Sequence, residues 1–104
     1  MNQNNIKNKI IESIRAADSK ATAYLFGSRA RGDFRPESDW DVLILIDENK
    51  VTDEIENKFR DKLYNIELET GQIISTFIYP KEYWANTLVY SPLFKKVRKE
   101  GVRL

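Results

Sequence analysis

The chain has 104 residues and contains neither histidine nor cysteine. These two absences exclude disulfides, triads built on histidine or cysteine, thiol nucleophiles and the usual zinc sites. The 17 lysines and arginines and the 16 acidic residues leave a formal net charge of +1, which argues against a general nucleic-acid-binding protein, because such proteins carry a basic surface.

The first half of the chain predicts a helix and two strands. Apolar residues at helical spacing favour an amphipathic helix that ends near residues 17–20. Residues 21–26 predict a short strand, and the polar residues 28–38 predict a loop with room for one helical turn. The apolar run 40–46 is typical of a strand in the middle of a sheet covered on both faces. The apolar positions of the helix are Ile6, Ile10, Ile11 and Ile14.

The second half predicts a long helix, a third strand and two further helices. Thr52 can cap the long helix and Gly71 can end it. Residues 72–79 predict a strand closed by Pro80, residues 81–86 a short helix, and Ser91-Pro92 the start of a last helix that ends at Gly101. This order predicts the α/β (α+β) class, with a small mixed β-sheet flanked by helices in a single domain over residues 1–104.

Nothing in the sequence predicts a membrane or secretion signal. The longest apolar run, residues 42–46, is far shorter than the roughly 20 residues that span a bilayer. Residues 1–5 lack the basic and apolar regions of a signal peptide. We therefore expect a cytoplasmic protein without a membrane partner, and no nucleic-acid partner either.

Asp39 and Asp41 form the first candidate site. Residues i and i+2 of a strand point to the same face, so the two carboxylates should lie roughly 6–7 Å apart beside an apolar strand. Their mutual repulsion would be relieved by a divalent cation, and oxygen-only ligands select Mg²⁺ or Mn²⁺. The alternative is that both aspartates simply begin the strand in contact with solvent.

Gly27-Ser28 forms the second candidate site, at the end of the preceding strand. Glycine allows the backbone to approach a ligand closely, and free N–H groups in such a turn suit phosphate. Ser28 adds a hydroxyl donor, and Arg29 and Arg31 add positive charge. Taken alone, the segment favours a tight turn with two solvated arginines.

Together, Gly27-Ser28, ten intervening residues and Asp39-x-Asp41 resemble the signature of the DNA polymerase beta-like nucleotidyltransferase superfamily. The amino-acid sequence of residues 27–32 and 38–44 is most similar to that of its small bacterial members, the minimal nucleotidyltransferases. The resemblance implies the nucleotidyltransferase fold, with Gly27 and Ser28 binding the triphosphate. It further implies that Asp39 and Asp41 are catalytic and hold up to two Mg²⁺ ions, and that Arg29 or Arg31 assists nucleotide binding.

The resemblance also implies a function. The expected reaction is a Mg²⁺-dependent transfer of a nucleoside monophosphate, AMP from ATP in the first instance, to a hydroxyl on a protein or small molecule. Such proteins can serve as the antitoxin of a toxin–antitoxin pair, with a small all-helical HEPN-type partner encoded nearby. The alternative is a weak or inactive protein that acts by binding nucleotide or by contacting a helical partner directly.

One part of the family pattern is missing. The resemblance implies a third carboxylate on the strand within residues 73–78, where this sequence has no acid and Ser75 or Thr76 stands instead. Glu67 and Glu69 lie upstream, on the end of the predicted helix. Beyond Phe94 the chain is basic except for Glu100, which indicates either a solvated helix face or a surface for an acidic partner.

Overall fold

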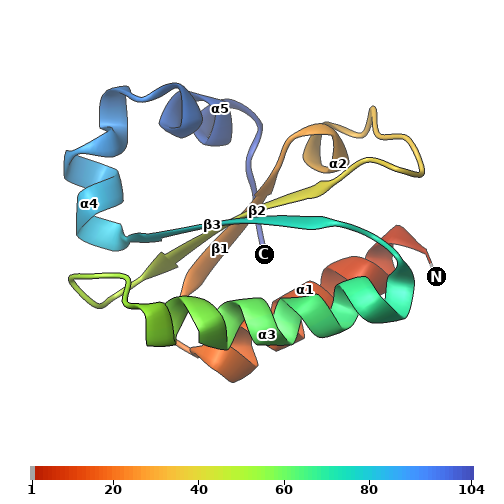
Figure 1. Cartoon of the computed structure of the whole chain (residues 1–104). Helices are drawn as coiled ribbons and strands as arrows, with labels where there is room; N and C mark the ends of the chain where they lie inside the picture. The colour runs from red at the N-terminus through yellow and green to blue at the C-terminus, as the bar shows by residue number, and fades with distance from the viewer. Residues whose placement is uncertain (1) are drawn as a thin grey trace.

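The computed structural model describes residues 2–104, in which a four-stranded sheet lies between two groups of helices (Figure 1). The helices are α1 (Gln3–Ala17), α2 (Ser28–Arg31), α3 (Asp53–Thr70), α4 (Lys81–Asn86), α5 (Pro92–Glu100) and the 3₁₀ turn η1 (Leu88–Tyr90). The strands are β1 (Thr22–Phe26), β2 (Trp40–Ile46), β3 (Ile74–Pro80) and β4 (Val102–Arg103). This arrangement confirms the predicted class, a small mixed sheet flanked by helices.

The sheet has the strand order β3-β2-β1-β4, with β2 and β1 in the middle. Strand β1 runs antiparallel to both β2 and β4, whereas β2 and β3 are parallel. The interior position of β2 explains its continuous apolar run, because both of its faces are covered. Asp41 pairs with Phe26 of β1 on one side and with Ser75 of β3 on the other.

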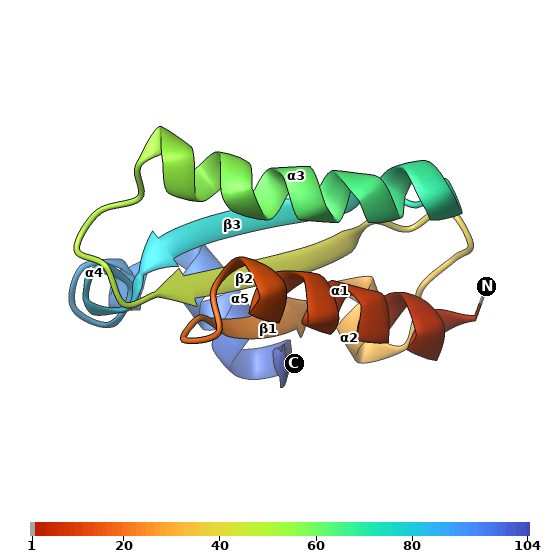
Figure 2. The ribbon, with the colours of Figure 1, turned by 90° about the horizontal axis from the view of Figure 1, so that it is seen from below.

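Helices α1 and α3 lie side by side across one face of the sheet (Figure 2). Ile6, Ile10 and Ile14 of α1 are buried together with alternate residues of β2, whereas Ile11 is half-buried. The buried residues of α3 in this core are Phe59, Leu63 and Ile66. This is the larger of the two cores. Its most deeply buried members are Ile10, Trp40, Val42, Ile44, Ile46 and Phe59.

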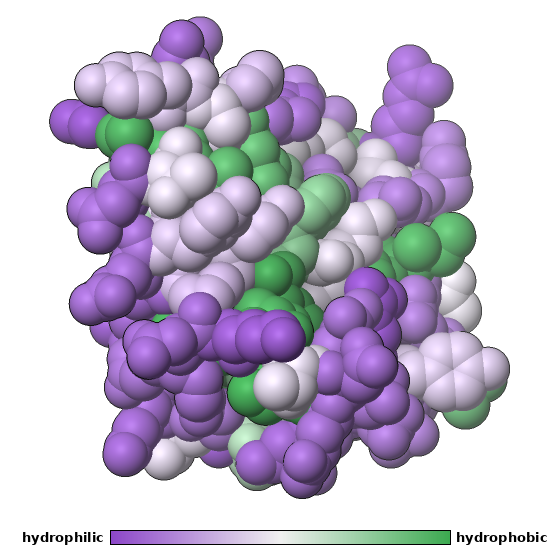
Figure 3. Space-filling view, turned by 60° about the vertical axis from the view of Figure 1, so that its left-hand side comes forward, coloured by the Kyte–Doolittle hydropathy of each residue, from purple (hydrophilic) through white to green (hydrophobic). Residues whose placement is uncertain are grey.

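Helices α4 and α5 cover the opposite face with a second core that is rich in aromatic rings. Trp84 of α4 and Val97 of α5 are buried against Leu43 and Leu45 of β2. The Trp84 ring also contacts Phe94, with ring centroids 5.1 Å apart. Two aromatic side chains nearby remain exposed, Tyr83 at 45 % and Tyr90 at 85 %. On the side where α4 lies, Figure 3 shows pale and hydrophobic surface bordered by hydrophilic side chains.

The helix ends follow the local signals in the sequence. The side-chain oxygen of Thr52 accepts the Ile55 N–H at 3.2 Å, and that of Ser91 accepts the Phe94 N–H at 3.1 Å. Gly71 ends α3 with a φ of 72°, a conformation that favours glycine. The third strand begins at Ile74 rather than residue 72, because Gly71 and the two residues after it turn the chain from the helix into the sheet. None of the described helices is long and apolar enough to cross a membrane.

Candidate functional site

The predicted site residues meet at one end of the sheet, where β1 ends and β2 begins. Because these strands are antiparallel, the turn after Phe26 lies beside the first residues of β2. The parallel register with β3 brings Ser75 beside Asp41. Three segments that are distant in sequence therefore converge here, and α2 caps this end of the sheet while α4 lies at the other (Figure 1).

Gly27 packs directly against the carboxylate of Asp41. Its φ is 75°, and a Cβ placed on it would lie 2.2 Å from Oδ2 of Asp41. Any other residue would therefore have to adopt a disfavoured backbone conformation and displace the carboxylate. The glycine of the predicted phosphate-binding turn and the second aspartate thus form one packed unit.

Asp39, directly before β2, and Asp41, the second residue of β2, lie close together but differ in exposure. Asp39 is exposed, and its Oδ2 accepts a hydrogen bond from the Ser75 hydroxyl at 3.3 Å. Asp41 is half-buried, and this burial is the main cause that raises its pKa. The nearby charges of Asp39 and Glu100 raise it further, while Lys96 and Arg31 oppose the shift.

These two carboxylates suit a hard divalent cation. Within residues 2–104 neither forms an ion pair with a lysine or arginine, so their charge is not neutralised by the protein. Two carboxylates that lie close together, one of them open to solvent, are typical ligands for Mg²⁺. The described part of the chain contains no group of three acidic side chains placed to hold an ion. Further ligands would therefore have to come from water or substrate.

The two arginines of the site take different positions. Arg29 is only 6 % exposed, and its guanidinium donates to the carbonyl oxygens of Pro36 and Ser38 and to Oε1 of Gln72. It also lies 4.7 Å from the centre of the Trp40 ring. In this position Arg29 fixes the loop that leads to Asp39.

Arg31, in contrast, faces the turn. Its guanidinium forms ion pairs with Asp33 at 3.3 Å and with Glu100 at 3.0 Å. The hydrogen bond with Glu100 is the main cause that raises the pKa of Arg31. Ser28 is half-buried at the start of α2, next to the buried Gly27.

Glu100 is a member of the site that the sequence reasoning missed. It is the last residue of α5, and one of its carboxylate oxygens accepts the Gly27 N–H at 2.9 Å. Burial raises its pKa, but the hydrogen bonds from Arg31 and Gly27 outweigh burial and leave the pKa below its ordinary value. The only signal in the sequence was that Glu100 is the single acid in a basic segment.

The structure settles where the alternative acids lie. Glu67 accepts the backbone N–H of Ile74 at 2.9 Å, and Glu69 pairs with Lys9 of α1 at 2.9 Å. Both are therefore engaged away from Asp39 and Asp41. Of the two residues considered for the place of the third carboxylate, Ser75 is the one that faces the aspartates.

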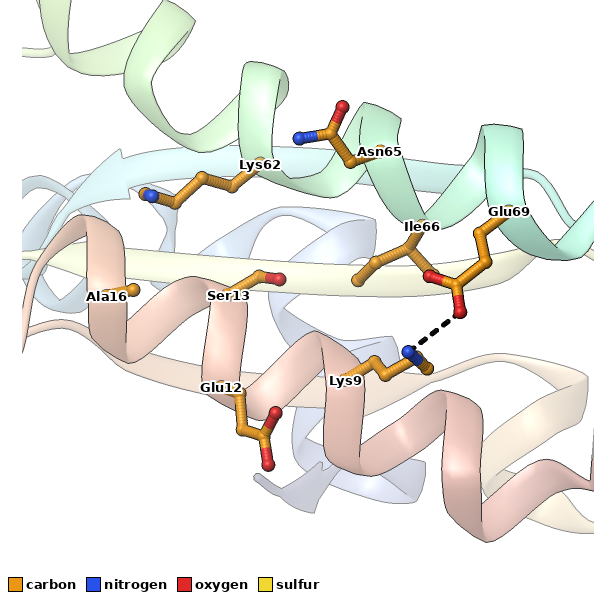
Figure 4. A pocket seen from close by; sticks show the side chains of 8 residues that line it. All are labelled: Lys9, Glu12, Ser13, Ala16, Lys62, Asn65, Ile66 and Glu69. Carbon is orange, nitrogen blue, oxygen red and sulfur yellow. Dashed lines mark ion pairs between the residues drawn. The ribbon is translucent and has the colours of Figure 1, made fainter.

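A hollow in the surface lies away from this site. It is a polar groove of about 350 Å³ between α1 and α3, and the Lys9–Glu69 ion pair spans it (Figure 4). None of its lining residues belongs to the site described above. The lining consists of Lys9, Glu12, Ser13, Ala16, Lys62, Asn65, Ile66 and Glu69.

Comparison with known proteins identifies a family and a fold. The profile of the family described as "Nucleotidyltransferase domain" matches residues 7–102. Among curated proteins, none matches the sequence at a significant level.

Three solved structures share the fold. A chain from a toxin–antitoxin complex with AMP-PNP superposes with a TM-score of 0.67 at 22 % identity, covering 93 % of this chain and 70 % of that one. A chain from the MntA–HpeT toxin–antitoxin complex gives 0.65 at 23 %, covering 94 % and 70 %. A chain from the tri-AMPylated Shewanella oneidensis HEPN toxin in complex with MNT antitoxin gives 0.64 at 18 %, covering 98 % and 71 %.

Proposed function

This chain belongs to the nucleotidyltransferase domain family, and from that premise we propose that it transfers AMP from ATP to a hydroxyl group with the help of Mg²⁺. The observation that carries the proposal is the contact between the Gly27 turn and Asp41. It brings a turn suited to phosphate and an unpaired carboxylate suited to a metal into one site.

In the proposed reaction each residue has a separate task. The Gly27 N–H, the Ser28 hydroxyl and Arg31 bind phosphate oxygens of the nucleotide, and Arg29 positions the loop that carries Asp39. Asp39 and Asp41 would hold Mg²⁺, which when bound neutralises charge on the reacting phosphate and its leaving group. The acceptor oxygen bonds to the α-phosphorus, the bond to the bridging oxygen breaks, pyrophosphate leaves, and the hydroxyl proton passes to solvent.

We propose a protein as the acceptor and an antitoxin role for the chain. One structural neighbour is described as an antitoxin in complex with a tri-AMPylated HEPN toxin. A matching partner for this chain would be a small helical protein encoded next to it. Its hydroxyl would approach from the open side of the site, where Asp39 is exposed.

The experiment follows the transfer of label from ATP that is labelled at its α-phosphate. The purified chain, Mg²⁺ and the product of the neighbouring gene should give a labelled partner protein. Asp39→Asn should remove the label, whereas Asp61→Asn, which changes an exposed acid on α3, should leave it unchanged. Equal labelling by the wild type and the Asp39→Asn variant would refute the proposed role of the acid pair.

Ser75 favours a second candidate function. An acid beside the metal-binding pair would help remove the proton of the acceptor, and this position carries only a hydroxyl. The chain could then neutralise its partner by direct contact. In that case the two proteins form a stable complex, no label is transferred, and Ser75→Asp raises the transfer rate above that of the wild type.

A further inference from the structure

Glu100 occupies the donors that the proposed function assigns to phosphate. One carboxylate oxygen accepts the Gly27 N–H at 2.9 Å, and the other accepts from the guanidinium of Arg31 at 3.0 Å. The Glu100 side chain is 12 % exposed, and its hydrogen bond with Gly27 is partly buried, whereas its ion pair with the more exposed Arg31 is open to water. A single carboxylate thus bridges the turn and the arginine, as a phosphate group with two oxygens would.

We infer that Glu100 is a built-in competitor for the polyphosphate of the nucleotide, and that its carboxylate must leave Gly27 and Arg31 before the polyphosphate binds. This inference rests on the proposed function, since it deepens the account of the same site. Glu100 thereby becomes a determinant of affinity. A ligand binds well only if it carries enough negative charge to replace a carboxylate on both donors.

The fold holds the backbone of Glu100 close to the turn. Gly101 follows it, and a Cβ there would lie 2.4 Å from the carbonyl oxygen of Val97, so the chain passes tightly over the end of α5. The next residues form β4 and pair with β1, the strand that leads directly into Gly27. The pairing of β1 with β4 therefore holds the backbones of Gly27 and Glu100 near each other, and rotation of the Glu100 side chain can release the donors without moving the backbone.

The charges around the turn explain why the competition has a measurable cost. Asp39, Asp41 and Glu100 bring three negative charges to this end of the sheet, against Arg31 and Lys96. A polyphosphate that enters beside the carboxylates meets this negative potential and must also break an ion pair. Removing the charge of Glu100 lowers both obstacles and leaves Asp33 as the acid that pairs with Arg31.

The test measures polyphosphate affinity by calorimetry, with inorganic triphosphate and Mg²⁺ as the probe. Glu100→Gln keeps the shape and an acceptor for Gly27 but loses the charge that holds Arg31. We expect its affinity to rise about tenfold, since a hydrogen bond to a charged group is no longer lost on binding. The control Glu82→Gln changes an exposed acid on α4 and should bind as the wild type does.

A second measurement uses the wild-type chain and needs no variant. During an NMR titration with the same probe, the Gly27 amide and the Glu100 carboxyl carbon should shift together and saturate at the same concentration. A Gly27 response without a Glu100 response would overturn the inference.

The outcomes separate the inference from the proposed function. If the wild type binds triphosphate and folded Glu100→Gln binds no more tightly, the competition is refuted and the proposed function stands. If neither protein binds the probe, both the inference and the proposed function fail.

Discussion

On the face of the sheet that α1 and α3 cover, Trp40, Val42 and Ile44 of β2 are 0 % exposed. On the other face the same strand begins with Asp41, half-buried and without an ion pair among residues 2–104. One strand therefore serves the main core with alternate residues, and with the residues between them it serves the site at Asp41 and the second core at Leu43 and Leu45. We therefore expect that stability and chemistry can be altered separately by substitutions only one residue apart.

The two faces of the sheet also differ in how completely helices cover them. The first is covered by two long helices, α1 and α3, whose apolar stripes are buried. The second is covered by shorter helices, with half-buried aromatic rings around a small buried cluster. The site lies beside this less tightly closed core. Its carboxylates can therefore remain accessible while the first core supplies most of the apolar burial.

Phe59→Ala tests the first face and should have the largest effect on stability. Phe59 is 1 % exposed in α3, so the change leaves a cavity in the main core and should lower the free energy of unfolding by about 3–5 kcal/mol. Urea denaturation measures the loss. Phe94→Ala, at a half-buried ring of the second face, should cost distinctly less, and equal losses would contradict the difference between the faces.

Asp41→Asn tests the chemistry of the second face. Loss of a metal-binding charge should lower nucleotidyl transfer by at least about a hundredfold, since metal ions contribute several kcal/mol to such reactions. The fold should remain, because the side chain keeps its shape beside Gly27. Transfer assays measure the loss of activity, and thermal melting of the same preparation measures whether the fold is retained. A variant that loses activity by unfolding would undo the separation between core and site.

Gly27→Ala and Gly32→Ala form a matched pair at the site. Both glycines have positive φ, 75° and 93°, so the backbone strain of alanine should by itself cost about 1–2 kcal/mol at either position. Only at Gly27 does the new Cβ meet the Asp41 carboxylate, while nothing lies within 4 Å of it at Gly32. Nucleotide binding should therefore fall for Gly27→Ala alone, as calorimetry would show. Equal binding by the two variants would argue against the Gly27–Asp41 unit.

The pH dependence of stability is the smallest expected effect. Burial raises the pKa of Asp41 in the folded state, so its contribution is fully present below the unfolded pKa of about 3.9 and is lost as the pH rises through the folded pKa. In the Asp41→Asn variant the side chain does not titrate, so this pH-dependent loss of stability is absent. In metal-free buffer, its stability relative to the wild type should increase in urea titrations as the pH rises above about 4, the ordinary pKa of an aspartate. A constant difference would mean that Asp41 titrates normally.

The sequence by itself determined most of the helices and strands and the placement of the acid pair Asp39 and Asp41. Helical spacing located α1 and α3, the caps at Thr52 and Ser91 located two helix starts, and strand alternation placed Asp39 and Asp41 close together. These features depend on residues within a few positions of each other, where backbone geometry dictates which side chains are neighbours. The two-residue strand β4 was not predicted, since so short a segment carries no periodicity.

Only the tertiary structure decided how distant residues complete the site. Arg29 and Arg31 look equivalent in the sequence, yet the path of the loop directs Arg29 toward Trp40 and Arg31 toward Glu100. Glu100 reaches Gly27 across 73 positions of sequence, and Ser75 reaches Asp39 across 36. Such contacts follow from strand order and register, which arise when the whole core packs and which no local pattern encodes.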